Sequence, residues 1–173
     1  MTDLYERIVS QRSSFEELMT QVPGYRGYKD ASDRRAADRM IREHIVGLLK
    51  EQMARLNEID RKILTSSGLS EAGKTHEARL KFQTFIDRVN TATPGYAGFY
   101  DAQKIGPDEL AKIYSFDAAL VAYVNKFREA IDALDAAVAN KDTLPGAIAQ
   151  LEALGTEANA AYDLRSNVLT EIA

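Results

Sequence analysis

The residues of this chain best suited to binding chemistry lie in a decapeptide that occurs twice. Residues 22–31 read VPGYRGYKDA and residues 93–102 read TPGYAGFYDA, so the proline, both glycines, the first tyrosine, the aspartate and the last alanine agree. Aromatic side chains bury much area at low entropic cost and dominate the energetic centres of interfaces. The repeated pattern favours a shared aromatic surface for a peptide or partner helix, formed by Tyr25, Tyr28, Tyr96, Phe99 and Tyr100.

A purely structural role is the alternative for both loops. Glycine permits the positive φ angles of tight turns, proline follows a helix end, and aspartate can cap the next helix. In this interpretation the loops connect helices and their aromatic rings pack against the end of the bundle. The residues of this structural frame are Pro23, Gly24, Gly27, Asp30, Pro94, Gly95, Gly98 and Asp101.

A cluster of arginines follows the first loop but not the second. Arg34, Arg35 and Arg39 would stand at the start of a helix, where positive charge opposes the helix dipole. Asp38 can compensate through an i,i+4 pair with Arg42. One interpretation is a solvated face with local ion pairs. The other is a site for an anion or an acidic partner, formed by the three arginines.

Catalytic and metal-binding patterns are absent from the sequence. A di-iron helical bundle needs Glu-x-x-His on paired helices, but Ile41 and Gly73 stand three residues before His44 and His76. The sequence also lacks His-Glu-x-x-His, a phosphate-binding glycine loop and the serine nucleophile elbow. We therefore expect a non-catalytic protein that holds no metal and no cofactor.

Composition limits the class of protein and its partners. The chain has 173 residues, of which 45% are hydrophobic, a net charge of −4 and no cysteine. Binding to nucleic acid needs a strongly cationic face, so the negative net charge argues against nucleic acid as a partner. The lack of cysteine fits a reducing compartment. The sequence contains neither a signal peptide nor an apolar run of about 18 residues that could span a bilayer. We expect one cytoplasmic domain over residues 1–173, with peripheral membrane association left open.

Apolar residues recur every three or four positions through most of the chain, which is the spacing of packed helices. The stripe is cleanest between Leu110 and Val138, where it follows the heptad pattern of a coiled coil. The sequence therefore predicts an all-α fold, an elongated antiparallel bundle of about five helices. The expected helices cover about 3–21, 32–64, 70–91, 106–139 and 144–172.

Alignment of the two loops also aligns apolar residues around them. Phe15 then matches Ile86, and Leu49 matches Leu120, although helical periodicity alone produces some such matches. The pattern favours duplication of a helix–loop–helix unit, over about 3–64 and 70–139, followed by a fifth helix. Short connections make consecutive helices antiparallel, so both loops should lie at the same end of the bundle.

Asp117 interrupts the apolar stripe of the fourth expected helix. A buried carboxylate is costly unless it is paired or hydrogen-bonded. We predict a structural partner for it, either a tyrosine hydroxyl or an arginine of the second helix.

The segments GYRGY (24–28), DRRAAD (33–38), GYAGFYDA (95–102) and YSFDAAL (114–120) resemble an uncharacterised family of bacterial all-helical proteins. The similarity covers roughly residues 22–135. It implies an all-helical bacterial protein and brings no activity with it.

The sequence as a whole favours a scaffold, adaptor or regulatory protein that binds a protein partner through its PGYxG loops. The alternative is a sensor of a small ligand or anion that uses Arg34, Arg35 and the loop aromatics. Homo-oligomerisation through the second and fourth expected helices is a third possibility.

Overall fold

The computed structural model describes residues 2–11, 14–91 and 95–172. These residues form seven α-helices and one short 3-10 helix, and none of them lies in a strand, so the predicted all-α fold is confirmed. The helices are α1 (Thr2–Val9), α2 (Ser14–Gln21), α3 (Arg34–Ser67), α4 (Leu69–Asn90), α5 (Ala97–Asp101), α6 (Pro107–Ala137) and α7 (Leu144–Glu171), and the 3-10 helix η1 covers Ala31–Asp33.

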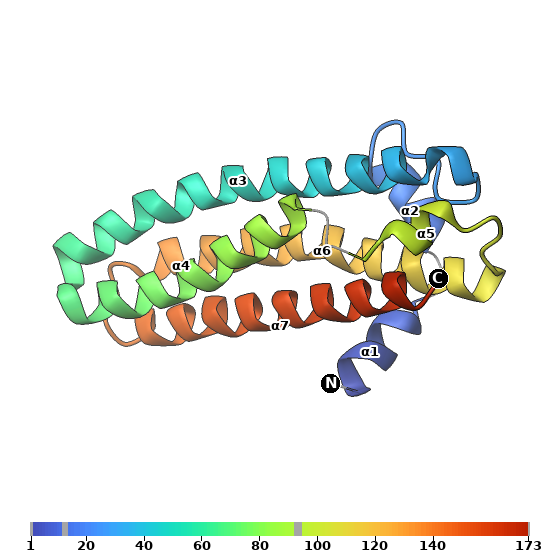
Figure 1. Cartoon of the computed structure of the whole chain (residues 1–173). Helices are drawn as coiled ribbons and strands as arrows, with labels where there is room; N and C mark the ends of the chain where they lie inside the picture. Colours follow the sequence, from blue (N-terminus) through green and yellow to red (C-terminus); the bar gives the residue numbers. More distant parts are fainter. Residues whose placement is uncertain (1, 12–13, 92–94, 173) are drawn as a thin grey trace.

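Four long helices form an elongated bundle (Figure 1). α3 and α4 make one antiparallel hairpin, and α6 and α7 make the other. The hairpins pack side by side, with α4 against α7 and α3 against α6, and in each of these two pairs the helices run in the same direction. The short connections within each hairpin enforce the antiparallel pairs, whereas the apolar stripes decide how the hairpins meet.

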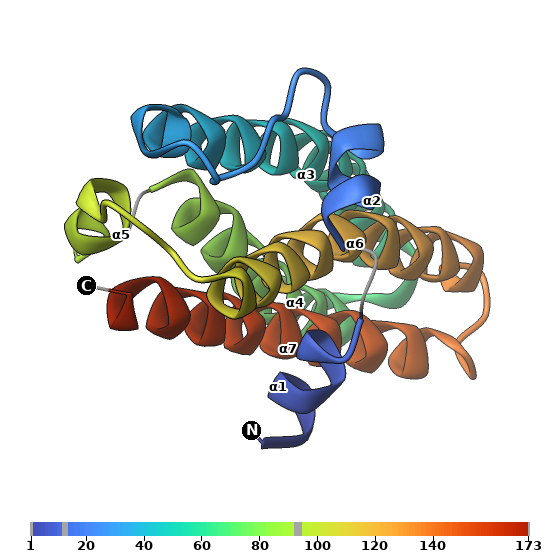
Figure 2. The ribbon, with the colours of Figure 1, turned by 90° about the vertical axis from the view of Figure 1, so that its right-hand side faces the viewer.

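The prediction of one continuous helix over residues 3–21 is wrong, because the chain forms α1 and α2 there. The Ser10 hydroxyl donates to the carbonyl of Arg7 over 3.0 Å, and the Ser14 hydroxyl donates to that of Gln11 over 3.1 Å. Such local bonds from serine compete with a continuous helix. The break allows α2 to pack on α6 while α1 lies outside the bundle, against α6 and α7 (Figures 1 and 2).

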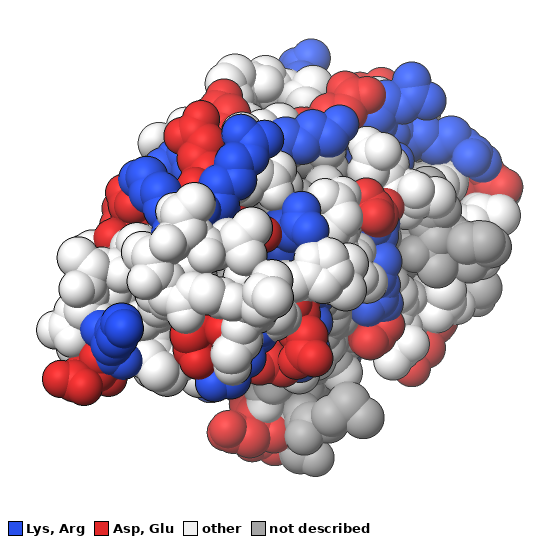
Figure 3. Space-filling view, turned by 90° about the vertical axis from the view of Figure 1, so that its left-hand side faces the viewer, with Lys and Arg blue, Asp and Glu red and all other residues white. Residues whose placement is uncertain are grey.

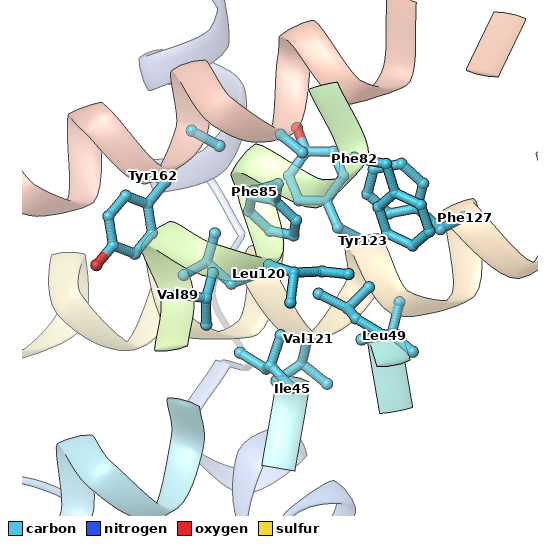
Figure 4. Close-up of a cluster of buried hydrophobic side chains, with 14 of the residues drawn as sticks. Ile45, Leu49, Phe82, Phe85, Val89, Leu120, Val121, Tyr123, Phe127 and Tyr162 are labelled. Atoms are coloured by element: carbon cyan, nitrogen blue, oxygen red, sulfur yellow. The ribbon is translucent and has the colours of Figure 1, made fainter. Parts of the chain in front are cut away.

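The centre of the bundle is filled by aliphatic and aromatic side chains from all four long helices (Figure 4). Phe82 of α4 stacks on Phe127 of α6 with ring centroids 4.0 Å apart, and both rings are buried. Fully burying one such side chain stabilises the fold by about 1.5–3 kcal/mol. The labelled members of this cluster are Ile45, Leu49, Phe82, Phe85, Val89, Leu120, Val121, Tyr123, Phe127 and Tyr162.

The backbones of α4 and α7 approach each other closely at Gly155. A Cβ atom added to this glycine would lie 2.9 Å from the Cβ of Lys81 and 3.5 Å from its backbone carbon. The Asn159 side-chain amide donates across the same contact to the carbonyl of Lys81, over 3.0 Å. Gly155 therefore sets the distance between the two hairpins.

Replacement of Gly155 by alanine should change the free energy of unfolding in the opposite direction to replacement of an exposed helical glycine. Gly47 lies in the middle of α3, and apart from its chain neighbours and the nearby backbone of α3 no atom lies within 4 Å of a Cβ added there. We expect Gly47→Ala to raise the free energy of unfolding by about 1 kcal/mol through helix propensity. Gly155→Ala should lower it by about 1–3 kcal/mol because the helices must move apart. Urea denaturation measures both values, and equal stabilisation by the two variants would contradict the close approach.

Candidate functional site

The two loops lie at the same end of the bundle, beside the end of α7 (Figures 1 and 2), as the sequence predicts. The ring of Tyr28 in the first loop meets the ring of Phe99 in the second, edge to face, with centroids 5.2 Å apart. Two segments that are far apart in sequence therefore form a single unit, which we call the loop end.

The aromatic side chains of the loops point inward, so the prediction of an exposed aromatic surface is wrong. The exposed fraction is 4% for Tyr25, 0% for Tyr28, 2% for Tyr96 and 0% for Phe99, and Tyr100 is half-buried. The loop rings pack on one another, and the ring of Tyr28 also stacks on Tyr114 of α6 with centroids 5.7 Å apart.

The length of the helices explains this burial. α3 has 34 residues but α4 has 22, so α4 stops about 18 Å short of the loop end at the usual helical rise. Figure 1 shows α4 ending inside the bundle. The loop rings fill the volume beside α3, α6 and α7 that a longer α4 would occupy.

The glycines of the first loop have the structural role that the sequence predicts. Gly24 and Gly27 have φ angles of +79° and +83°, which disfavour any other residue. A Cβ atom at Gly27 would also lie 2.6 Å from the Tyr114 hydroxyl oxygen and 2.7 Å from a ring carbon of Phe15. Pro23, next to Gly24, is exposed.

The second loop repeats this geometry only in part. Gly95 has a φ angle of +107° and matches Gly24, but Gly98 lies inside α5. Asp30 accepts a hydrogen bond from the backbone N–H of Ser32 over 3.0 Å, so its predicted capping role is confirmed. The same prediction for Asp101 is wrong, because this residue ends α5 and pairs with an arginine. Pro94 lies outside the described residues.

A buried group of charged and hydroxyl side chains lies beneath the loops and centres on Asp117. The Tyr28 hydroxyl donates to one oxygen of Asp117 over 2.5 Å, and Nε of Arg165 donates to the other over 2.6 Å. Nη2 of Arg165 also donates to Asp38 over 2.8 Å. The prediction of a tyrosine partner for Asp117 is confirmed. Its arginine comes from α7, and not from the second expected helix.

Asp38 extends the group to the end of α4. Its second oxygen accepts hydrogen bonds from Nε of Arg42 and from the Tyr100 hydroxyl, each over 2.8 Å. The predicted i,i+4 pair of Asp38 and Arg42 is therefore confirmed. Arg42 also donates to the carbonyl of Asn90 over 3.1 Å, where α4 leaves acceptors without helical partners. We call Tyr28, Asp38, Arg42, Tyr100, Asp117 and Arg165 the buried network.

The four charges of the buried network balance. Burial opposes ionisation of Asp38, but Arg165 and Arg42 outweigh it and hold the pKa of this carboxyl below its ordinary value. At Asp117 burial prevails over Arg165 and raises the pKa of the carboxyl. Burial also holds the pKa of Tyr28 well above its usual range, so this hydroxyl remains a donor at neutral pH. Asp38, Asp117 and Arg165 have no exposed side-chain surface, and the arrangement can join elements rather than receive a ligand.

Arg34 joins the two loops through their backbones. It is 1% exposed, its Nε donates to the carbonyl of Tyr28 over 2.9 Å, and its Nη1 donates to the carbonyls of Phe99, over 3.3 Å, and Ala102. The prediction of an anion site formed by the three arginines is therefore wrong for Arg34, because carbonyls already accept from its guanidinium.

The other two arginines of the cluster are accessible to solvent. Arg35 pairs with Asp101 over 3.0 Å, and its guanidinium carbon lies 4.5 Å from the centroid of the Tyr100 ring. Arg39 is exposed. The structure thus divides Arg34, Arg35 and Arg39 between the interior and the surface instead of bringing them to one site.

Sequence reasoning missed Arg165, which the whole buried network needs. A signal for it exists, because Arg165 is the only lysine or arginine in α7 and it follows Tyr162 by three positions on the apolar stripe. A single basic residue among apolar ones predicts a buried acidic partner. Asp117 is the matching acidic residue in α6.

Metal-binding clusters and helices that could span a membrane are both absent from the described residues. They contain no group of three or more His, Cys, Asp or Glu side chains that could hold a metal ion. No helix in this part of the chain has both the length and the apolar character to cross a bilayer.

Comparisons with models of protein families, with curated proteins and with solved structures find no match to this chain. Functional inference therefore depends on the geometry of the molecule itself.

Loss of Arg165 should destabilise the fold far more than loss of a surface cation. Arg165→Met leaves the buried Asp117 without a cation and Asp38 with Arg42 alone, and we expect a cost of about 3–5 kcal/mol. Lys62 pairs with Asp135 over 2.9 Å at the surface, where 56% of the lysine side chain is exposed. Lys62→Met should therefore cost at most about 1 kcal/mol. Guanidinium denaturation compares the two, and similar costs would show that the buried network does not support the fold.

Two tyrosines of the first loop allow a matched test of hydroxyl groups. Tyr28→Phe removes a donor to the buried Asp117 and should cost about 1.5–3 kcal/mol. The Tyr25 hydroxyl is also buried, but it makes no hydrogen bond of normal geometry with the described residues. Tyr25→Phe should change stability by less than about 0.5 kcal/mol. Thermal and urea unfolding measure both, and a larger effect at Tyr25 would overturn this assignment of roles.

Proposed function

We propose that this protein is a non-catalytic helical-bundle scaffold, adaptor or regulatory protein that binds a protein partner at its loop end. One observation carries the proposal. Arg34 bonds the backbones of both loops, and the rings beneath them are buried, so the loop end is rigid before any partner arrives. A surface that is already ordered loses little conformational entropy on binding.

The contact surface in this proposal consists of the outer residues of the loops and of the first turns of α3, with the buried rings as its support. It combines backbone, positive charge and negative charge within a small area, as the rim of a protein interface does. The exposed residues of this surface are Pro23, Gly24, Arg26, Lys29, Arg35, Arg39, Gly95, Ala97 and Asp101.

The pairing and burial of Asp38 and Asp117 support a non-catalytic role in this proposal. A general acid or base must come within hydrogen-bond reach of its substrate. Asp38 and Asp117 are paired with arginines and have no exposed side-chain surface. We also place the protein in a bacterial cytoplasm, because the chain contains no cysteine and resembles bacterial helical proteins.

The alternative function, a sensor of anions or small ligands, is not favoured by any observation at the loop end. Its central residue, Arg34, is buried and donates to three carbonyl groups. Arg35 has a carboxylate partner and an aromatic ring over which it lies.

Charge reversal at the loop end tests the proposed partner surface. Arg26 and Lys29 are exposed on the first loop. We expect Arg26→Glu with Lys29→Glu to reduce recovery of the native partner at least about tenfold, because repulsion at an interface rim slows association. Quantitative affinity purification from the native cell measures this, with circular dichroism to verify the fold.

The opposite end of the bundle supplies the control. That end displays positive and negative side chains interspersed with uncharged residues (Figure 3). Arg61 and Lys141 are exposed near it, so Arg61→Glu with Lys141→Glu makes the same change of charge far from the loops. Equal recovery of the partner by both double variants would refute binding at the loop end.

A further inference from the structure

The N-terminal helix α1 covers a groove between α6 and α7. The ring of Tyr5 meets the ring of Phe116 with centroids 5.8 Å apart, and Ile8 is 4% exposed. α1 contacts both α6 and α7, but it stands outside the four-helix arrangement (Figure 2). Among its described side chains, Ile8 alone is fully buried. The bundle therefore has its own core, and α1 is an addition to it.

A carboxylate marks one side of this groove. Glu157 of α7 accepts a hydrogen bond from the Tyr123 hydroxyl over 2.7 Å and pairs with Arg7 of α1 over 3.1 Å. Lys126 lies 3.6 Å from the same oxygen. Burial opposes ionisation of Glu157, but these three groups outweigh it and lower the pKa of the carboxyl. The groove therefore presents a fixed negative charge to whichever helix occupies it.

α1 fills the groove incompletely. A cavity of about 70 Å³ lies between Leu4, Arg7 and Ile8 of α1 and a surface of α6 that includes Ala119 and Ala122. A second cavity, of about 320 Å³, lies where α2 packs on α6 and is lined by Val9, Gln11, Ser14, Phe15, Ala111, Tyr114 and Ser115. Small residues on α6 allow a helix to approach closely, yet α1 has only eight residues. The larger cavity belongs to the contact of α2 with α6, so the room that α1 itself leaves against α6 is the cavity of about 70 Å³.

The contacts that hold α1 on the bundle are also weak. The side chains of Arg7 and Glu157 are 52% and 36% exposed, and exposed ion pairs contribute little to stability. A helix of eight residues has low intrinsic stability in water. A longer helix with the same pattern of side chains could therefore replace α1.

We propose that the groove between α6 and α7 is a docking site for an amphipathic helix of a protein partner, and that α1 occupies it in the free protein as a displaceable competitor. The partner helix carries apolar residues four positions apart, as Leu4 and Ile8 are, and an arginine or lysine in the place of Arg7. Its basic residue pairs with Glu157, and apolar side chains larger than those of α1 fill the cavity against Ala119 and Ala122 of α6.

This inference rests on the proposed function of a partner-binding protein and adds a second, regulated surface to it. A partner must displace α1, so its apparent affinity equals its affinity for the open groove multiplied by the fraction of molecules in which the groove is open. Weakening α1 without altering the groove should therefore increase affinity.

The test uses the full chain and a fluorescent peptide with the sequence of residues 2–11, TDLYERIVSQ. Ile8→Asp releases α1 and leaves every residue of α6 and α7 unchanged, and Leu4→Asp serves the same purpose if that variant does not fold. By fluorescence anisotropy, we expect the released variant to bind the peptide at least about tenfold more tightly than the unaltered chain. Adding Glu157→Lys should weaken this binding about fivefold or more. A peptide with Asp in place of both Leu4 and Ile8 is the matched control.

Several results would overturn the proposal. They are no binding of the peptide to the released variant at about 1 mM, equal binding of the control peptide, or no effect of Glu157→Lys. A dimer of the unaltered chain that Ile8→Asp abolishes, seen by light scattering, would assign the groove to α1 of a second copy. Peptide binding reports on the groove alone, and the Arg26 and Lys29 reversals report on the loop end alone, so either proposal can fail without the other.

Discussion

The contact of the Arg165 guanidinium with Asp38 and Asp117 is the constraint on which the loop end depends. Burying a charge is expensive, and the cost is offset only when partners and geometry are complete. Here α3, α6 and α7 each contribute one of the three charged groups. A shift of any of these helices by one turn, about 5.4 Å, would leave a buried charge without its partner. The contact therefore specifies how the helices align, more than how stable the bundle is.

The early end of α4 and the inward direction of the loop aromatics depend on each other. Because α4 ends at Asn90, the loop end has space for rings and hydroxyl groups that a complete fourth helix would exclude. Arg42 compensates for the early end of α4 by donating to its last carbonyls, and the same arginine pairs with Asp38. Arg34 then holds the two loop backbones together over this filled space. A rigid outer surface follows from buried polar chemistry rather than from exposed aromatics.

The sequence predicts the long helices and the common position of the loops, because apolar spacing and short connections depend on local rules. It predicts less about the loops, since periodicity assigns a face to each helical residue but no direction to a ring such as Tyr28. The length of α4 was the available signal, because its expected range is a third shorter than that of α3. The pairing of Asp117 with Arg165 joins residues 48 positions apart, so each stripe can indicate a buried charge but the contact itself depends on how the helices of the hairpin pack. Ser10 and Ser14 could have indicated the break in the first expected helix.

The chain uses one chemical arrangement twice, at two depths. Asp117 accepts from the Tyr28 hydroxyl and from Arg165, and Glu157 accepts from the Tyr123 hydroxyl and from Arg7. In the first group every charged atom is removed from water. If Arg165 left, neither water nor another cation could replace it at Asp117, so this contact stays fixed. In the second, solvent reaches both members of the ion pair, so water or another cation can replace Arg7 at little cost. The depth of burial, and not the identity of the groups, thus separates a fixed ion pair from one whose cation can be exchanged. This difference is the physical reason to seek partner exchange at α1 and a rigid surface at the loops.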